Sequence, residues 1–453
     1  MRIAPASVVL GLCLLASSAP GQAQGPGTPS PGDTQAPPAA ARVVGRVLSL
    51  EEAIGIALET QPLIQARLSD YMAAAHRVDQ AFAPLLPQLF ASGSASAAQR
   101  VGAAPRSPLD PRGTGTNTTV SDFGDDTRLG VTLSQVIFDF GKTFASTEAA
   151  RRLAEQAQED VELQRQLITL TVKESFVNIN FARRLIRVQE QALERADLNL
   201  RSARGFFEVG TRPKSDVARA EVDVANARVD LIRARNAERL ARVALNTAMG
   251  VPADTPTEVQ DNLVYQAMAI DRAQLLSQAL AQRPEYKQAR LRVDEADARM
   301  RRAFRDFFPE VSGTAFYGGA RTDLNEIWEL GLTLSWSIFD GGNRIARLRE
   351  TRASVEAEKA RVLATELDIS REVEQAQLNV SEAQERIGAA QTAVASAQEN
   401  FRLAQGRFDA GVGTILELTD AQLFLTQAQN IETQALADYR IAVARLERAI
   451  GRR

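Results

Sequence analysis

The sequence predicts a mainly α-helical protein with a small β part, in which a unit of strands followed by a long helical hairpin occurs twice. Three observations predict it: an internal repeat, long proline-free stretches with apolar residues every three or four positions, and short segments in which apolar and hydroxylic residues alternate. The 453 residues are 45% hydrophobic and 24% charged, which suits a large core and excludes a disordered chain. A formal net charge of −3 gives no reason to expect a nucleic-acid partner.

The first 23 residues have the pattern of an export signal. A positive charge precedes the apolar stretch 8–16, and small residues around 21–23 suit cleavage. The single cysteine, Cys13, lies in this segment and follows a leucine, whereas a lipid-anchoring signal has a small residue there. We therefore expect cleavage without lipidation. Residues 24–47 are rich in proline and glycine and are expected to form a linker.

An internal repeat divides the rest of the chain into two units, 48–250 and 271–451, joined by a linker at 251–270. The segments GVTLSQVIFDFGK (130–142) and GLTLSWSIFDGGN (331–343) are identical at eight of 13 positions, at an offset of 201 residues. Earlier in the units the offset is 222 residues, so the first unit carries 21 extra residues, which fall in a loop rich in proline, glycine and threonine. The chain is therefore a duplicated unit with one lengthened loop.

Two segments in each unit are predicted to be strands with one apolar and one hydroxylic face. In the segment Leu332-Thr333-Leu334-Ser335-Trp336, apolar and hydroxylic side chains alternate. The predicted strands span about 88–98 and 128–138 in the first unit, and about 310–320 and 328–339 in the second. Each has about the 9–11 residues that a tilted strand needs to cross a membrane. Aromatic residues within or beside them suit a membrane interface: Phe90, Phe316, Tyr317, Trp328 and Trp336.

The proline-free stretches predict two long helical hairpins. Proline inside a helix costs about 3 kcal/mol, and Pro213 is the only proline between Arg112 and Val251. The first arm, residues 143–208, would be about 100 Å long. Each arm should end at a glycine-containing tip, near 209–214 in the first unit and near 410–415 in the second. The last part of the first arm carries a heptad seam, formed by Leu193, Ala196, Leu200, Ala203 and Phe207. The same seam recurs 201 positions later in the second unit.

This order of elements resembles the TolC-type outer-membrane efflux protein family. The resemblance covers nearly all of the chain from Leu48 to Gly451. The segments that carry it are LSLEEAIGIAL (48–58), LLPQL (85–89), the two IFD-x-G motifs, VGTRPKSDVARAE (209–221), ALNTAMGVP (244–252) and AGVGTILELTDAQ (410–422).

The resemblance implies a homotrimer in the outer membrane of a Gram-negative bacterium. Four strands from each chain would form one shared 12-stranded β-barrel against outer-membrane lipid, and the hairpins would form an α-barrel tunnel through the periplasm. The implied partners are a periplasmic adaptor (membrane fusion) protein and an inner-membrane pump of the RND, ABC or MFS class. The implied function is a passive conduit for efflux or type I secretion. The sequence does not distinguish between these two transport routes. A soluble periplasmic coiled-coil adaptor or scaffold is the alternative, which the amphipathic strand pairs disfavour.

The resemblance places adaptor docking at the two hairpin tips. The residues concerned are Gly210, Thr211, Pro213 and Asp216 in the first tip, and Gly411, Gly413 and Thr414 in the second. A structural interpretation competes with docking, because any antiparallel hairpin needs glycine at its turn. In that interpretation Asp216 and Ser215 cap the returning helix.

Two carboxylates, Glu417 and Asp420, are predicted to line the periplasmic entrance of the pore. Their spacing of three residues puts both on one helical face, which on its own also fits a solvated surface. By resemblance this stretch lines a closed entrance, where three chains would gather six carboxylates. Arg407 or Arg212 would offset their charge.

The sequence indicates no enzyme, and we expect no catalytic, cofactor or metal site. His76 is the only histidine, and there is no GxSxG segment, phosphate-binding loop or metal-spaced cluster. The IFD-x-G motifs have a structural interpretation: Asp139 and Asp340 would cap the long helices, and the following glycines would supply the turn.

Overall fold

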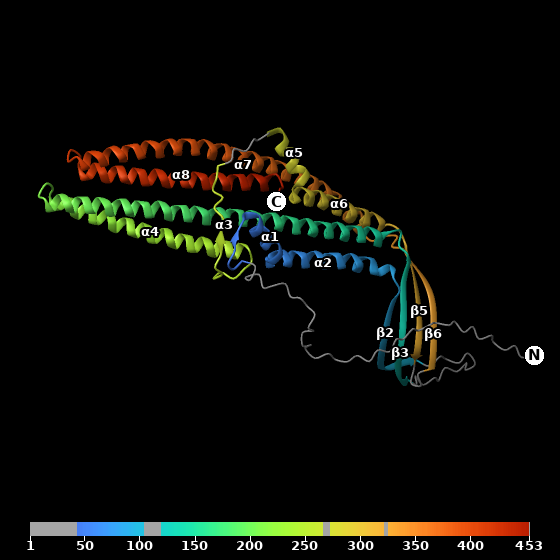
Figure 1. Cartoon of the computed structure of the whole chain (residues 1–453). Coiled ribbons are helices and arrows are strands. Elements are labelled where there is room, and N and C mark those ends of the chain that lie inside the picture. Colours follow the sequence, from blue (N-terminus) through green and yellow to red (C-terminus); the bar gives the residue numbers. More distant parts are fainter. Residues whose placement is uncertain (1–42, 104–118, 266–271, 321–324, 453) are drawn as a thin grey trace, which may run out of the picture.

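The structure is a computed structural model, which describes residues 43–103, 119–265, 272–320 and 325–452 (Figure 1). The predicted export signal and most of the predicted linker at 24–47 lie outside the described residues. Part of the lengthened loop of the first unit and part of the predicted linker between the units also lie outside them.

Two helical hairpins dominate the fold. The 67-residue helices α3 (Lys142–Glu208) and α7 (Asn343–Asp409) are each followed by a 35-residue returning helix, α4 (Lys214–Ala248) and α8 (Ile415–Ala449). Figure 1 shows the four helices side by side, with both tips at one end and the sheet at the other. Helix α3 packs against α4 and also against α8, which joins the hairpins. The predicted mainly helical fold with two long hairpins is confirmed.

A pair of shorter helices precedes the strands of each unit. These are α1 (Leu50–Thr60) and α2 (Pro62–Phe82) in the first unit, and α5 (Arg272–Gln282) and α6 (Pro284–Arg305) in the second. A proline begins the second helix of each pair, where its missing N–H is not needed. A short 3₁₀ turn, η2 (Ala83–Leu85), links α2 to the sheet. Helices α2, α3, α6 and α7 pack in that order, and none of the helices described is both long and apolar enough to cross a membrane.

The sheet contains four antiparallel strands, in the order β2-β3-β5-β6. They are β2 (Gln88–Ala103), β3 (Thr119–Phe138), β5 (Glu310–Ala320) and β6 (Asn325–Ser335). Strands β3 and β5 come from different units, so their pairing joins the units at this end of the molecule. Strands β2 and β6 are the two edges of the described sheet.

The register gives the sheet one apolar and one polar face. On β6, Leu330, Leu332 and Leu334 lie on one face and are between 66% and 78% exposed. Leu330 is paired with Ala315, which in turn is paired with Leu133, so the apolar face continues across β5 and β3. The opposite face carries the alternating hydroxylic residues that the sequence predicted, among them Thr132 and Thr333. Phe90 and Phe316 are in register with Thr132, so these two predicted interface aromatics lie on the hydroxylic face and not on the apolar one. The described residues therefore leave the apolar face uncovered.

The predicted fourth strand, 328–339, is wrong at its end. Strand β6 ends at Ser335, which pairs with the first residue of β5, Glu310. The residue before Glu310 is a proline, which cannot donate to a ladder, and β6 has a partner on one side only. Trp336 leaves the sheet, and its indole N–H donates to the carbonyl of Phe307 at 3.1 Å. The strands of the first pair, in contrast, run further into their loop than alternation predicted.

The segment between the units, predicted to be a linker, is partly folded. Strand β4 (Glu258–Val259) pairs in parallel with β1 (Val47–Leu48), and Leu263 is buried. Asn246, fully buried at the end of α4, donates to two backbone carbonyls of this segment and accepts from the hydroxyl of Thr257. The linker interpretation missed these contacts because they join residues that are distant in sequence or lack a periodic pattern.

Candidate functional site at the hairpin tips

Backbone hydrogen bonds close the first tip around Gly210. This glycine has a φ of +72°, a conformation that favours glycine, and its N–H donates to the carbonyl of Phe207 at 2.9 Å. The N–H and the hydroxyl of Thr211 both donate to the carbonyl of Phe206 at 2.9 Å. These bonds satisfy carbonyls that the end of α3 would otherwise leave unpaired. Gly210 and Thr211 therefore have a structural role at the turn.

The second tip uses glycine for two different reasons. Gly411 has a φ of +78°, as the turn requires. Gly413 is buried, and a Cβ there would lie 3.0 Å from the backbone of Arg407, so a side chain would not fit without movement. The hydroxyl of Thr414 accepts from the backbone N–H of Glu417 at 3.2 Å and so caps α8.

The first returning helix begins differently. Its N-cap residue is Pro213, and no side chain caps the helix start by a hydrogen bond. The expectation that Asp216 and Ser215 cap α4 is therefore wrong, because the cap position is occupied by a residue without a side-chain oxygen. Asp216 instead faces Arg212, with 3.7 Å between Oδ2 and Nη1 and with side chains only 15% and 13% exposed.

Arg212 joins the two tips. Its Nη2 donates to the carbonyl of Gly413 at 2.6 Å, and its guanidinium carbon lies 4.5 Å from the ring centroid of Phe408. Phe408 is fully buried and meets Phe206 edge to face at 5.6 Å between centroids. A partly buried charge-assisted hydrogen bond contributes about 1.5–3 kcal/mol, and the cation–π contact adds about 0.5–2 kcal/mol. Sequence reasoning considered Arg212 only as a partner for the entrance carboxylates and missed this contact.

The two predicted entrance carboxylates are exposed on α8. Glu417 lies 3.6 Å from Arg407, measured from Oε2 to Nε, and Asp420 lies one turn further along the helix. Of the two suggested basic partners, Arg407 therefore contacts Glu417, whereas Arg212 is bonded to the other tip. An exposed pair of this kind contributes about 0–1 kcal/mol.

The ends of the tips expose apolar side chains. Val209 is 71% exposed and Val412 is 72% exposed, and Phe207 and Leu416 are each more than 40% exposed. Clustered exposed apolar groups of this kind are typical of protein contact surfaces.

Polar side chains between α3 and α8 extend the contact between the hairpins. Asn199 donates to the side-chain oxygen of Gln422 at 2.7 Å, and the Gln422 amide donates to the carbonyl of Ala192 at 3.1 Å. Further along, the Gln189 amide donates to Asn430 at 3.4 Å. The two hairpins are thus held together over several turns above their tips.

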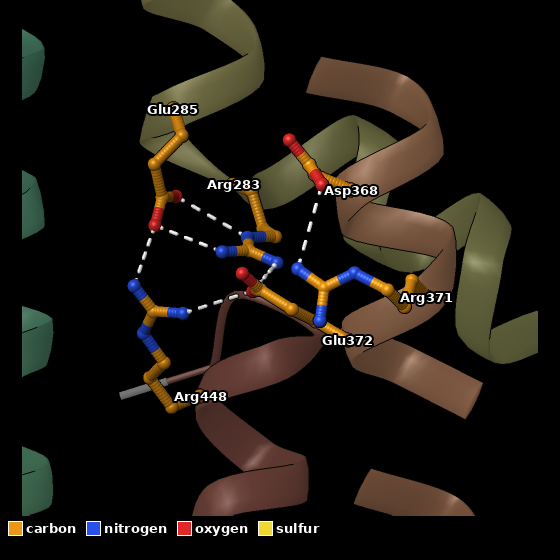
Figure 2. Close-up of polar contacts among 6 residues, drawn as sticks. All are labelled: Arg283, Glu285, Asp368, Arg371, Glu372 and Arg448. Atoms are coloured by element: carbon orange, nitrogen blue, oxygen red, sulfur yellow. Dashed lines mark hydrogen bonds and ion pairs between the residues drawn. The ribbon is translucent and has the colours of Figure 1, made fainter. Parts of the chain in front are cut away.

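A charged cluster lies where α5 and α6 meet α7 and the end of α8 (Figure 2). Arg283, only 2% exposed, donates to Glu372 at 2.7 Å and to Glu285 at 2.9 Å, and Arg448 contacts both carboxylates. Burial favours the neutral acid, but the hydrogen bonds from Arg283 outweigh it and lower the pKa of Glu285. In the first unit the equivalent of Arg283 is Gln61, whose amide donates to two carbonyls at the end of α4.

The IFD-x-G motifs mark the junctions between strands and long helices. Asp139 accepts from the N–H groups of Gly141 at 2.8 Å and Thr143 at 2.6 Å. Asp340 accepts in the same way from Gly342 and Arg344. The structural interpretation of these aspartates is confirmed.

The described residues contain no group of three or more histidine, cysteine, aspartate or glutamate side chains placed to hold a metal ion. His76 is exposed on α2, and its Nδ1 lies 3.5 Å from Asp79.

Two long hairpins that lie side by side, with a four-stranded sheet at the end opposite their tips, form the fold of outer-membrane channel subunits. The chain belongs to the outer membrane efflux protein family, whose model matches residues 53–251 and 275–452. The family suggested by the sequence is thereby confirmed.

Individual relatives are distant. The chain is 24% identical over 241 residues to the outer membrane efflux protein BepC of Brucella suis, a match that covers 52% of each chain. It is 25% identical over 328 residues to the alkaline protease secretion protein AprF of Pseudomonas aeruginosa, covering 68% of this chain and 65% of AprF. The matches thus span about half of BepC and just under two thirds of AprF.

A solved structure shows the same fold. The CmeC outer membrane channel of Campylobacter jejuni superimposes with a TM-score of 0.73 at 19% identity, over 89% of this chain and 85% of CmeC.

Proposed function

We propose that this protein is the trimeric outer-membrane channel of a tripartite efflux or type I secretion system, a passive conduit from the periplasm or an inner-membrane pump to the exterior. The observation that carries the proposal is the sheet: no other described part of the chain covers its apolar face or pairs with its two edges, β2 and β6. With β6 of one copy beside β2 of the next, three copies would close a 12-stranded barrel. Such a barrel would have no edges, and its apolar face would meet lipid.

The helical part supports the same assembly. Exposed apolar side chains run along α4 and α7, the outer members of the two hairpins in one chain: Val222, Ile232, Leu240, Leu363, Leu367 and Leu378. Neighbouring copies would cover these side chains, so that the hairpins of three chains form an α-barrel tunnel through the periplasm.

The far ends of the hairpins would meet the partners. The tip residues Gly210, Thr211, Pro213, Asp216, Gly411, Gly413 and Thr414 shape a surface from which Val209 and Val412 project. This surface would dock a periplasmic adaptor, which connects the tunnel to an inner-membrane pump of the RND, ABC or MFS class. The glycines would set the shape of the surface, and the valines would supply its apolar contact.

The entrance of the tunnel would carry Glu417 and Asp420 from each chain. Six carboxylates around a narrow opening favour cations and repel one another. The contact between Arg407 and Glu417 would offset part of that charge.

The proposal covers two kinds of cargo. One relative is named for efflux and another for secretion of an alkaline protease. A passive tube is compatible with both, because the pump selects what enters.

Membrane fractionation and conductance test the proposal. We expect the protein in the outer-membrane fraction as a heat-modifiable trimer that conducts ions in a planar bilayer. A monomer that stays in buffer without detergent and forms no channel would refute the proposal and favour a soluble coiled-coil scaffold.

A further inference from the structure

Each of the four helices that meet the sheet carries an exposed apolar side chain at that end. These are Phe82 at the end of α2, Phe144 at the start of α3, Phe304 near the end of α6 and Ile345 at the start of α7, and they are between 37% and 60% exposed. Phe304 occupies the position of Phe82 in the second unit, at the offset of 222 residues. Ile345 occupies the position of Phe144, at the offset of 201 residues. We call these four side chains the apolar belt.

The apolar belt continues the apolar face of the sheet. The rings of Phe82 and Phe144 lie 6.3 Å apart between centroids, so both are on one side of the helices. The ring of Phe304 lies 6.5 Å from that of Phe307, whose carbonyl accepts from the exposed indole of Trp336 just beyond β6. The proposed function turns the apolar face of the sheet towards lipid. The lipid-facing surface would then extend past the strands onto the adjoining turns of the helices.

Two arginines lie on α7 below the apolar belt. Arg349 and Arg352 follow Ile345 by four and seven residues, so all three share one helical face, and the arginines lie about 6 and 10 Å further along the axis. Both are exposed, and neither guanidinium group has an ion pair or a hydrogen bond to another described residue. Side chains of a helix lean towards its N-terminus, and α7 begins at the sheet. A headgroup layer about 5–8 Å thick beside the apolar belt is therefore within their reach.

The first repeat shows that a neighbouring chain would not cover this face. Helix α3 packs between α2 and α6, yet Phe144 and the side chain of Arg151 are each 60% exposed. In a closed ring, α7 would lie in the same way between α6 and the α2 of the next chain. Its equivalent residues, Ile345 and Arg352, would therefore stay open after assembly.

The charges on this face differ between the repeats. The position of Arg349 is taken in α3 by Glu148, which pairs with Arg151 at 3.6 Å and with Arg152 at 2.8 Å. The first unit thus neutralises its own cations, whereas the second leaves Arg349 and Arg352 without a counter-charge. Three chains would present six such arginines in a ring next to the apolar belt. Cations beside an apolar band fit a surface that is both apolar and anionic.

We propose that Arg349 and Arg352 bind the phosphate groups of anionic phospholipids in the inner leaflet of the outer membrane, while the apolar belt enters the acyl chains beside them. This inference rests on the proposed function, which sets the direction of the sheet in the membrane. It adds a lipid site that only the second repeat carries. The chain would sit deeper in the membrane than its strands alone require, and the ring of arginines would fix that depth.

Fluorescence quenching by lipids brominated on the acyl chain tests the depth, with the full-length protein reconstituted in vesicles. The variant Trp336→Phe keeps Trp328, on the apolar face of β6, as the control for insertion. With both tryptophans replaced by phenylalanine, Ile345→Trp should be quenched. Arg347→Trp is the matched control, because Arg347 is only two residues further along α7 but lines the groove between α3, α6 and α7 on its opposite side. We expect no quenching there.

Native mass spectrometry of the protein in detergent, titrated with phosphatidylglycerol or phosphatidylcholine, tests the lipid class. An arginine near an anionic surface contributes about fivefold in affinity. Arg349→Gln with Arg352→Gln should therefore weaken binding of phosphatidylglycerol about 10–30-fold and leave binding of phosphatidylcholine unchanged. Lysine at both positions keeps the charge and should retain most of the preference. Arg228→Gln with Arg239→Gln removes two exposed arginines of α4, away from the sheet, and should change neither affinity.

Two results would overturn the proposal. If Trp328 is quenched but Ile345→Trp is quenched no more than Arg347→Trp, then protein covers the apolar belt, either another part of the chain or a neighbouring copy. A double glutamine variant that keeps its preference for phosphatidylglycerol would exclude the arginine site. If Trp328 itself is not quenched, the proposed function fails, and the titration in detergent would still decide whether the arginines select anionic lipid.

Discussion

Phe140 has a left-handed backbone with a φ of +54°, at the position where the second repeat has Gly341 with a φ of +70°. A phenylalanine in this conformation is strained, at a cost of about 1–3 kcal/mol. Its ring stacks on Phe308 at 5.3 Å and meets Phe138 at 4.7 Å between centroids. The bend from sheet to helix in the first repeat is thus held by aromatic packing, whereas the second repeat uses a flexible residue.

The strain at Phe140 predicts an unusual order of stabilities. Both Phe140→Gly and Phe140→Ala lose the ring contacts, but only glycine accepts the backbone conformation. We expect the glycine variant to be the more stable of the two by about 1 kcal/mol, measured by urea denaturation in detergent. As a matched control, Gly388→Ala, at a helical position with open space around the Cβ, should stabilise by about 0.5–1 kcal/mol. An alanine variant at 140 that equals or exceeds the glycine variant would rule out the strain.

The cap of the first long helix predicts a pH dependence. Burial acts to raise the pKa of Asp139, but hydrogen bonds from Thr143 and Gly141 outweigh it and lower that pKa. Because the folded-state pKa lies below the unfolded value of about 3.9, the stabilisation is complete above that pH and is lost as the pH falls through the folded-state value.

Asp139→Ala should therefore cost about 1–2 kcal/mol of unfolding free energy at neutral pH and progressively less below pH of about 4. Denaturant titrations of both proteins across this range measure the difference. His76→Ala, at an exposed position, serves as the control and should change little. A cost that stays constant into acid would show that the carboxylate charge is not responsible.

The charged cluster predicts strong coupling among its members. Arg283→Met would leave two partly exposed carboxylates that share one arginine and should destabilise by about 1–3 kcal/mol. Replacing all four members with the residues of the first repeat should cost much less, because no charge is left unpaired. That quadruple variant is Arg283→Gln, Glu285→Leu, Glu372→Thr and Arg448→Thr. Thermal unfolding measures the stability of the Arg283→Met variant and of the quadruple variant. An equal loss of stability in the two variants would contradict the coupling.

The entrance carboxylates predict a change in ion selectivity. In planar bilayers, Glu417→Ala combined with Asp420→Ala should change single-channel conductance and reduce the preference for cations. Asp79→Ala, a carboxylate removed from α2 far from the tips, is the matched control. Unaltered conductance and selectivity in the double variant would exclude these residues from the entrance.

The sequence predicted features that depend on local period or on the repeat. The hairpins followed from proline-free heptads, and the roles of Asp139 and Asp340 followed from their place before glycine. The end of β6 at Ser335 did not follow, because a strand ends where its partner ends.

The contacts at the hairpin tips could not be predicted from local sequence patterns either, because they join residues that are far apart in the sequence. Arg212 bonds to a residue 201 positions away, and the Pro213 cap leaves Asp216 free to pair with Arg212. The repeat offset, which aligns Arg212 with Gly413, was the one signal that could have drawn attention to this contact.

The number of chains in the native particle tests the central claim most directly, because the described part of one chain leaves apolar surfaces of the sheet and of the hairpins exposed. Native mass spectrometry of protein extracted from the outer membrane in detergent measures it. We predict a particle of three chains that requires detergent to remain in solution. A single chain that is stable and soluble in buffer alone would contradict the proposal that the protein is a trimeric membrane channel.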